Sequence, residues 1–256
     1  MSLAPARSWT DLRASLAGVR AEANKGYAFV ERGWYFTKRY WAWEAVWVVY
    51  NIVNALAVTF ISAAIQKTLP QIHFTRAQIN AFVLYLAIGT AIWSYVSVVF
   101  DGVTETVTIE RWEGTIEYTF MAPVSRLTHM LGICVFSLLH GFVLTALQLV
   151  VLSLFFHIDL AGANWLAATV VLAIGSVSLI GLGIISAILP MLFTERGAQM
   201  AYIIRAVLLL VSGVYYPVSV LPDFLQAAAK FSPATYVLDG LRASIQQGKG
   251  LGTLWY

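Results

Sequence analysis

ETVTIERWEGTIEYTFMAPVSR, residues 105–126, is a charged island between two long apolar runs. The flanking runs, Ala81–Phe100 and Leu127–Phe156, contain no Asp, Glu, Lys or Arg. The island holds four of the 13 acidic residues of the chain, namely Glu105, Glu110, Glu113 and Glu117. A loop that concentrates carboxylates between two runs of membrane length is predicted to be presented to a partner.

The composition of the whole chain indicates a membrane protein. Hydrophobic residues make up 59% of the sequence and charged residues only 11%, whereas a soluble domain contains about 25% charged residues. The net charge of +3 is ordinary for a membrane protein with cationic anchors and does not indicate nucleic-acid binding. The only cysteine, Cys134, lies within an apolar run, so it excludes an internal disulfide and gives no zinc-ligand spacing.

Five runs are long enough for a helix to cross a bilayer, which takes about 20 apolar residues. They are Trp41–Ile65, Asn80–Phe100, Leu127–Phe156, Trp165–Phe193 and Gly197–Val220. The sequence therefore predicts an all-α polytopic membrane protein that forms a single transmembrane domain over residues 1–256. The chain stops where a sixth span is expected, so we predict a further span after residue 256.

Basic residues predict the orientation of these spans, because cytoplasmic segments are rich in Lys and Arg. The first 40 residues hold seven of the 16 basic residues: Arg7, Arg13, Arg20, Lys25, Arg32, Lys38 and Arg39. We therefore expect a plasma (inner) membrane protein with a cytoplasmic N-terminus and with the charged island on the same side.

Residues 1–40 are predicted to form an amphipathic helix in the membrane interface, interrupted near Gly26 and Gly33. Its apolar face recurs at steps of three or four residues and comprises Trp9, Leu12, Leu16, Val19, Ala23, Tyr27, Val30 and Trp34. Two roles remain open for this helix. It is either a plain membrane anchor or a participant in coupling or substrate access.

Residues 217–248 are neither apolar nor long enough to span. Prolines divide them into two short predicted helices near Asp223–Lys230 and Pro233–Gln247, with Asp223 and Ser232 as candidate N-caps. Irregular backbone at membrane depth has to be covered by protein or to line a cavity. We therefore expect a re-entrant helical hairpin on the outer side of the membrane.

Within the island, apolar residues and carboxylates alternate with helical spacing. Ile109, Trp112, Ile116 and Phe120 fall on one side, while Glu110, Glu113 and Glu117 fall on the other. The pattern predicts one short amphipathic helix with an acidic stripe, weakened at Gly114 and ended by Pro123. A solvated helix lying on the membrane surface is the alternative interpretation.

A few ionisable and amide side chains fall inside the apolar runs, where they are costly and are candidates for function. Glu44 and Arg205 are predicted to pair with each other or to extend to the interface. Asn51, Asn54 and Gln148 are expected either to bond between helices or to face a pathway. Asp101 and Glu105 are predicted to end the second span at the inner surface. The four histidines are scattered, so no metal site is predicted, and no P-loop sequence is present.

The segment ERWEGTIEYTFMAPVSR resembles the cytoplasmic signature of permease subunits of type-2 ABC transporters. The matching residues are Glu110, Arg111, Gly114, Thr115, Glu117, Pro123, Ser125 and Arg126, and Glu113 falls at a variable position of the signature. Residues 215–242 resemble the re-entrant helices that precede the last span in this family. Its pattern is matched by Pro217, Leu221, Pro222, Ser232, Pro233, Tyr236 and Arg242.

This resemblance implies that residues 110–126 form a coupling helix that docks on a separate ATPase subunit. It implies a permease that is not itself an enzyme and binds no cofactor, with ATP and Mg held by two copies of a P-loop ATPase. It also implies a second permease copy, in a homodimer or a related heterodimer, surrounded by membrane lipid. The expected cargo is a small amphiphile, drug or lipid-like molecule. A glycan exporter of the same family, or an intramembrane enzyme or scaffold without an ATPase, is the alternative.

Overall fold

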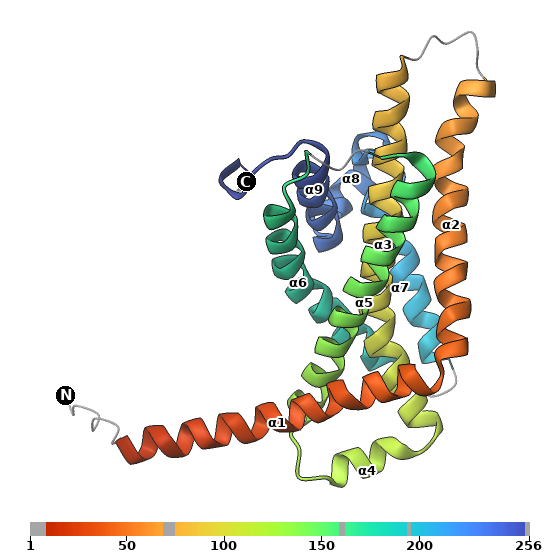
Figure 1. The fold of residues 1–256 in the computed structure, drawn as a ribbon. Coiled ribbons are helices and arrows are strands. Elements are labelled where there is room, and N and C mark those ends of the chain that lie inside the picture. Colours follow the sequence, from red (N-terminus) through yellow and green to blue (C-terminus); the bar gives the residue numbers. More distant parts are fainter. Residues whose placement is uncertain (1–8, 69–74, 159–161, 194–195, 254–256) are drawn as a thin grey trace.

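A computed structural model describes the chain except for residues 1–8, 69–74, 159–161, 194–195 and 254–256 (Figure 1). All regular secondary structure in the described residues is helical. The long helices are α1 (Trp9–Arg39), α2 (Trp41–Thr68), α3 (Arg76–Trp112), α5 (Arg126–Phe156) and α6 (Trp165–Leu192). The shorter elements are α4 (Thr115–Met121), α7 (Gly197–Val211), η1 (Val218–Val220), α8 (Asp223–Ala229), α9 (Pro233–Gln246) and η2 (Leu251–Thr253). The predicted all-α membrane architecture is confirmed, and the described part has four helices long and apolar enough to cross a membrane.

Helix α3 is the central element of the bundle and packs against α2, α5, α6, α7 and α9. Its buried stripe recurs every four residues, at Tyr95, Val99, Val103 and Val107, each at most 3% exposed. With 37 residues, α3 is about 55 Å long. It does not end near Phe100 as predicted but continues to Trp112, which carries it directly into the charged island.

Helix α7 is shorter than the fifth predicted span. It ends at Val211 after 15 residues, which is about 22 Å, so the predicted range Gly197–Val220 is wrong in its second half. The chain turns at Gly213, whose φ of 70° is in the left-handed region that favours glycine. The carbonyls released by this turn accept hydrogen bonds from Arg242 of α9.

The predicted helical hairpin is present as α8 and α9. Figure 1 shows it at the end of the bundle opposite to α1 and α4. Ser232 is the N-cap residue of α9 as predicted, although its side chain makes no capping hydrogen bond. Asp223 is not an N-cap, because Pro222 takes that position and Asp223 lies in the first turn of α8.

Arg242 is the residue that fastens this hairpin to the bundle. Its side chain is buried and donates to the carbonyls of Gly213 at 2.8 Å and Val214 at 2.6 Å, while the guanidinium lies 3.6 Å from the ring centre of Tyr85. We expect Arg242→Met to destabilise the protein by about 2 kcal/mol, because the Val214 carbonyl loses its Arg242 donor and the Gly213 carbonyl keeps only the Tyr85 hydroxyl, at 3.2 Å. Thermal unfolding in detergent measures this effect, with the exposed Lys230→Met as the matched control. Equal melting temperatures for the two variants would contradict the assignment.

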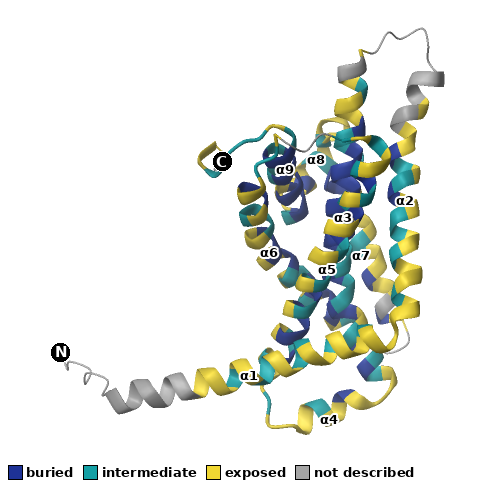
Figure 2. Ribbon diagram, in the orientation of Figure 1, coloured by how far each residue is buried: buried dark blue, intermediate teal, exposed yellow. Residues whose placement is uncertain are grey.

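Helix α1 runs across one end of the bundle and carries mostly exposed residues along its described length (Figure 2). The predicted interruptions at Gly26 and Gly33 are wrong, because α1 is one continuous helix. Gly33 of α1 and Gly132 of α5 instead allow the two helices to approach each other closely. A Cβ atom on Gly33 would lie 2.6 Å from the Phe136 ring, and one on Gly132 would lie 2.8 Å from the Gly26 carbonyl. The side chains of Trp9, Leu12 and Leu16 lie outside the described residues.

Candidate functional site

The charged island consists of two helical pieces rather than one. Glu110 and Arg111 belong to the last turns of α3, Glu113 lies in the link, and Glu117 belongs to α4. Gly114 separates the pieces with a φ of 71°, in the left-handed region. The prediction of a single helix with a continuous acidic stripe is therefore wrong. The helix is broken at the glycine because a left-handed residue cannot continue a right-handed helix.

Glu110 points into the protein, whereas Glu113 and Glu117 are exposed to solvent. Its side chain is 5% exposed and forms an ion pair with Arg32 of α1. His129 of α5 places its Nε2 atom 3.3 Å from the Glu110 carboxylate, and Phe29 packs against the His129 ring. Glu110 therefore joins α1, α3 and α5 at one buried point. The spacing of three and four residues in the sequence gave no sign that this acid differs from Glu113 and Glu117.

Helix α1 makes further polar contacts with the segment between α4 and α5. Lys25 donates from its Nζ atom to the Pro123 carbonyl at 2.9 Å, and the Thr128 hydroxyl donates to Glu22 at 2.6 Å. The hydrogen bonds from Lys25 and Thr128 hold the pKa of the Glu22 carboxyl below its usual value. These contacts attach α1 to the end of the island and to the first turn of α5.

The remaining signature residues build the outer surface and the ends of this segment. Ile116 is the buried residue of α4, and it anchors the helix to a cluster that includes Val107 and Ile133. Ser125 caps α5 by accepting from the Thr128 amide at 2.9 Å, and the Arg126 guanidinium lies 4.9 Å from the ring centre of Phe120.

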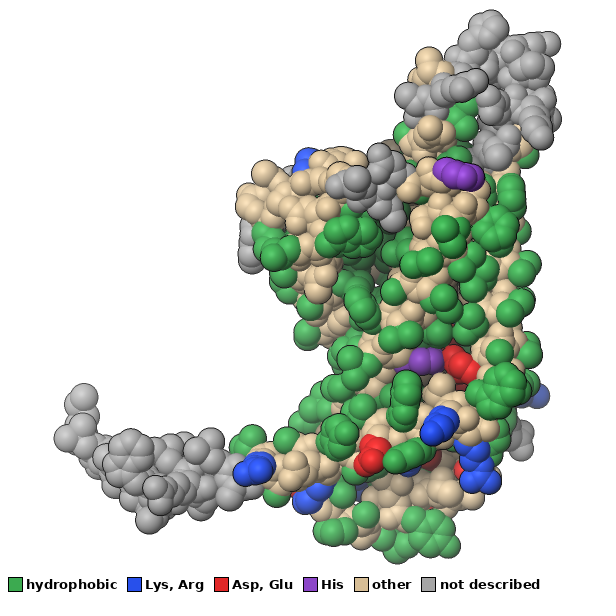
Figure 3. Space-filling view, in the orientation of Figure 1, with side chains coloured by type: hydrophobic (Ala, Val, Ile, Leu, Met, Phe, Trp, Pro, Cys, Tyr) green, Lys and Arg blue, Asp and Glu red, His purple; other side chains and the backbone are tan. Residues whose placement is uncertain are grey.

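Several residues are exposed together, namely Trp112, Glu113, Thr115, Glu117, Tyr118, Met121 and Pro123. Figure 3 shows apolar side chains gathered on this end of the molecule.

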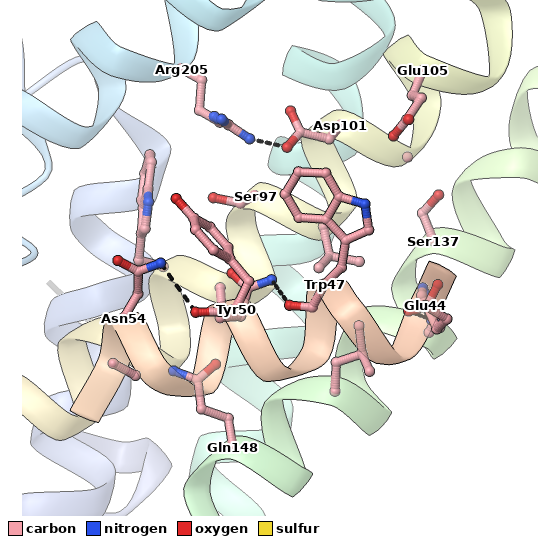
Figure 4. A pocket seen from close by; sticks show the side chains of 18 of the residues that line it. Glu44, Trp47, Tyr50, Asn54, Ser97, Asp101, Glu105, Ser137, Gln148 and Arg205 are labelled. Carbon is pink, nitrogen blue, oxygen red and sulfur yellow. Dashed lines mark hydrogen bonds and ion pairs between the residues drawn. The ribbon is translucent and has the colours of Figure 1, made fainter. Parts of the chain in front are cut away.

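A cleft of about 910 Å³ lies between α2, α3, α5 and α7, with the C-terminal end of α1 at its rim. It contains five polar side chains that the sequence placed inside the apolar runs: Glu44, Asn51, Asn54, Gln148 and Arg205. Figure 4 shows Glu44, Asn54 and Arg205 with Ser97, Asp101 and Glu105 from α3 and with Ser137 and Gln148 from α5. The structure thus brings together polar residues that are up to 161 positions apart, from Glu44 to Arg205.

The ion pairs in this cleft differ from the predicted ones. Arg205 pairs with Asp101 and not with Glu44, while Glu44 lies 2.9 Å from Nε2 of His140. Asp101 does not end the second span, because α3 continues past it. Asn51 and Asn54 donate to the carbonyls of Trp47 and Tyr50 in their own helix, at 2.8 and 3.1 Å. The carbonyl oxygens of both amides therefore remain available to the cleft.

The aromatic wall of this cleft was not predicted from the sequence. Trp43, Trp47 and Tyr50 of α2 line it, as do Trp93 of α3 and Tyr202 of α7. The signal was present in α2, where Trp47, Asn51, Asn54 and Val58 recur at steps of three or four with Glu44.

The hairpin residues carried over from the resemblance have local structural roles. Pro217 and Pro222 precede η1 and α8, and Pro233 is the first residue of α9. Tyr236 is 62% exposed and donates to the Lys230 carbonyl at 2.8 Å. None of these four residues lines the cleft.

Among the described residues, no group of three or more His, Cys, Asp or Glu is placed to hold a metal ion. A search of curated proteins gave no match. A comparison with known protein families matches residues 28–245 to the family described as ABC-2 type transporter. The match covers most of the chain, including the cleft and the charged island. This chain therefore belongs to the ABC-2 type transporter family and is a transmembrane subunit of an ABC transporter.

Proposed function

We propose that this chain is the permease of an ATP-driven exporter that moves a small amphipathic, drug or lipid-like molecule. ATP and Mg would be bound by two copies of a separate P-loop ATPase, and this chain would supply the pathway. The observation that carries the proposal is the direct connection between an exposed, acidic segment and a helix that lines the cleft. Helix α3 contains both Glu105, which lines the cleft, and Trp112, which begins the exposed part of the island.

The proposed docking surface for the ATPase is the outer face of residues 112–123. It combines two exposed carboxylates, Glu113 and Glu117, with exposed apolar side chains such as Tyr118 and Met121. The apolar side chains would provide contact area that is buried against the ATPase. The carboxylates would form charge-assisted hydrogen bonds with its basic side chains or backbone N–H groups. Helix α4 itself is attached to the bundle mainly through Ile116. A partner therefore finds most of this helix accessible.

The proposed coupling route runs from α4 through Gly114 into α3. Movement of the docked α4 would be passed to α3, and Glu110 would transmit it to α1 and α5 through Arg32 and His129. Asp101 and Glu105 lie on α3 between this point and the cleft interior, so a shift of α3 would alter the cleft directly. The signature residues Thr115, Pro123, Ser125 and Arg126 fix the shape of the segment between the two helices.

The assembly that we infer contains a second permease copy, identical or related, in the plasma membrane. Helix α2 supports this inference, because its outer face presents Trp41, Val46, Val49 and Val53, each more than half exposed. The basic N-terminal segment and the α4 surface lie at one end of the bundle, which we assign to the cytoplasm because cations mark that side. The hairpin of α8 and α9 then faces outward.

Co-purification and transport assays test this function. The tagged chain is co-expressed with a P-loop ATPase encoded in a neighbouring reading frame, and we expect the two to purify together in equal amounts. Inside-out vesicles containing the complex should accumulate a fluorescent amphiphile only when ATP is added. A chain that purifies without any ATPase, and vesicles that accumulate the amphiphile without ATP, would support the intramembrane scaffold instead.

A further inference from the structure

We infer that the cleft selects lipophilic organic cations and that Glu105 is its main charge-selecting residue. The inference rests on the proposed transport function for its biological meaning, but binding itself is measurable on the isolated chain. Three observations carry it: the charge balance of the lining, the aromatic wall, and a buried amide that faces the cleft without a partner.

The charge balance of the cleft is negative. Its ionisable lining consists of the three acids Glu44, Asp101 and Glu105 and of two bases, Arg205 and His140. Asp101 is neutralised by Arg205, and Glu44 is paired with His140. Glu105 forms no ion pair within the part of the chain that the structure describes; its charge is repelled by that of Glu44 and attracted by that of Arg205, which already pairs with Asp101. The cleft therefore keeps at least one uncompensated carboxylate, which favours a cation and disfavours an anion of equal shape.

The aromatic wall suits the apolar body of such a cation. Trp43, Trp47 and Tyr50 contact one another edge to face along α2, with ring centres 6.0 and 5.7 Å apart. Electron-rich ring faces attract cations, and the structure already contains one such contact here. The Arg205 guanidinium lies 5.1 Å from the ring centre of Tyr202. The wall thus provides apolar area and further attraction for positive charge.

Gln148 supplies the independent sign of a ligand. Its side chain is 3% exposed and lines the cleft, yet it forms no hydrogen bond with any described residue. The amide is not sealed inside the protein but reaches the open space of the cleft, so its oxygen and nitrogen atoms can bond with water or with a molecule that enters the site. The cleft volume of about 910 Å³ lies within the range of roughly 300–1,000 Å³ that is usual for small-molecule sites.

A pair of ions with the same shape and opposite charge tests the inference. The full chain is purified in an uncharged detergent, and equilibrium dialysis measures the binding of tetraphenylphosphonium and of tetraphenylborate, with empty micelles subtracted. We expect the phosphonium to bind at least about tenfold more tightly, because the uncompensated carboxylate attracts one ion and repels the other. Equal affinities, or tighter binding of the borate, would overturn the inference.

Two variants assign this preference to the cleft. Glu105→Gln should weaken phosphonium binding about tenfold and leave borate binding unchanged or stronger, and Glu44→Gln should act in the same direction. The matched control is Glu31→Gln, which removes the same charge from an exposed position of α1 outside the cleft. An unchanged preference in both cleft variants, with normal elution and melting, would refute the role of these acids. Selective phosphonium binding by a chain that associates with no ATPase would refute the proposed function alone.

Discussion

Reversing the two exposed acids of the island, Glu113→Arg together with Glu117→Arg, is expected to abolish ATP-driven transport without unfolding the permease. Both side chains are exposed, so the bundle loses no buried contact. If a complementary surface of the ATPase binds them, like charges would face each other and would cost about 3 kcal/mol, or roughly a 100-fold loss of affinity. Co-purification of the ATPase and ATP-dependent uptake into inside-out vesicles measure the loss.

The control for this double reversal is Glu31→Arg together with Asp223→Arg. It changes the net charge by the same amount at exposed positions of α1 and α8, away from the proposed docking surface. We expect the control to retain the ATPase and to transport normally. If the double reversal in the island also kept the ATPase and full transport, the coupling role of Glu113 and Glu117 would be wrong. Glu110 is left unchanged in this experiment because its contacts are internal.

Glu110→Ala is expected to lower the stability of the folded protein. Glu110 is 4% exposed and holds both Arg32 and His129. Removing one partner from a buried polar cluster leaves the others without their acceptor, and a loss of about 3 kcal/mol is expected. For a chain of this length, that loss corresponds to a melting temperature lowered by about 6–12 °C. Thermal unfolding followed by tryptophan fluorescence in detergent measures the change.

Glu113→Ala is the matched control, since it truncates a neighbouring acid that is exposed and should change stability by no more than about 0.5 kcal/mol. Glu110→Gln should fall between the two, because its amide oxygen still accepts a bond from one donor. Identical melting curves for Glu110→Ala and Glu113→Ala would show that the buried cluster contributes nothing. The pair of variants thus separates the internal acid of the island from the external ones.

The membrane architecture was predictable from the sequence because the bilayer imposes a length. Three of the predicted spans, Trp41–Ile65, Leu127–Phe156 and Trp165–Phe193, agree with α2, α5 and α6 within about three residues at each end. The two helices of the hairpin were also predicted closely, since prolines restrict where helices begin. Two helix ends were predicted wrongly. Helix α7 ends at Val211, where the turn that follows is held by Arg242 of α9, and α3 continues past Asp101, although the residues there are polar.

The sequence was sufficient to predict which residues belong to the candidate site, but not which of them contact one another. Glu44, Asn51, Asn54 and Arg205 were identified because polar groups in an apolar run are costly. Their partners were not, because Asp101 and His140 lie on other helices and their positions follow from how α3 and α5 pack. The aromatic face of α2 was visible in the spacing, but the neighbours that turn it into a wall were not.

The sequence by itself determined that this chain is a helical membrane protein with a charged, family-specific segment between two spans. Hydropathy, proline placement and a local signature decide these properties, and all three act over short stretches of chain. Only the tertiary structure decided that Glu110 is a buried link to Arg32 and His129, while Glu113 and Glu117 face outward. The physical reason is that periodicity fixes which side of a helix a residue occupies, whereas burial depends on which other helices pack against that side.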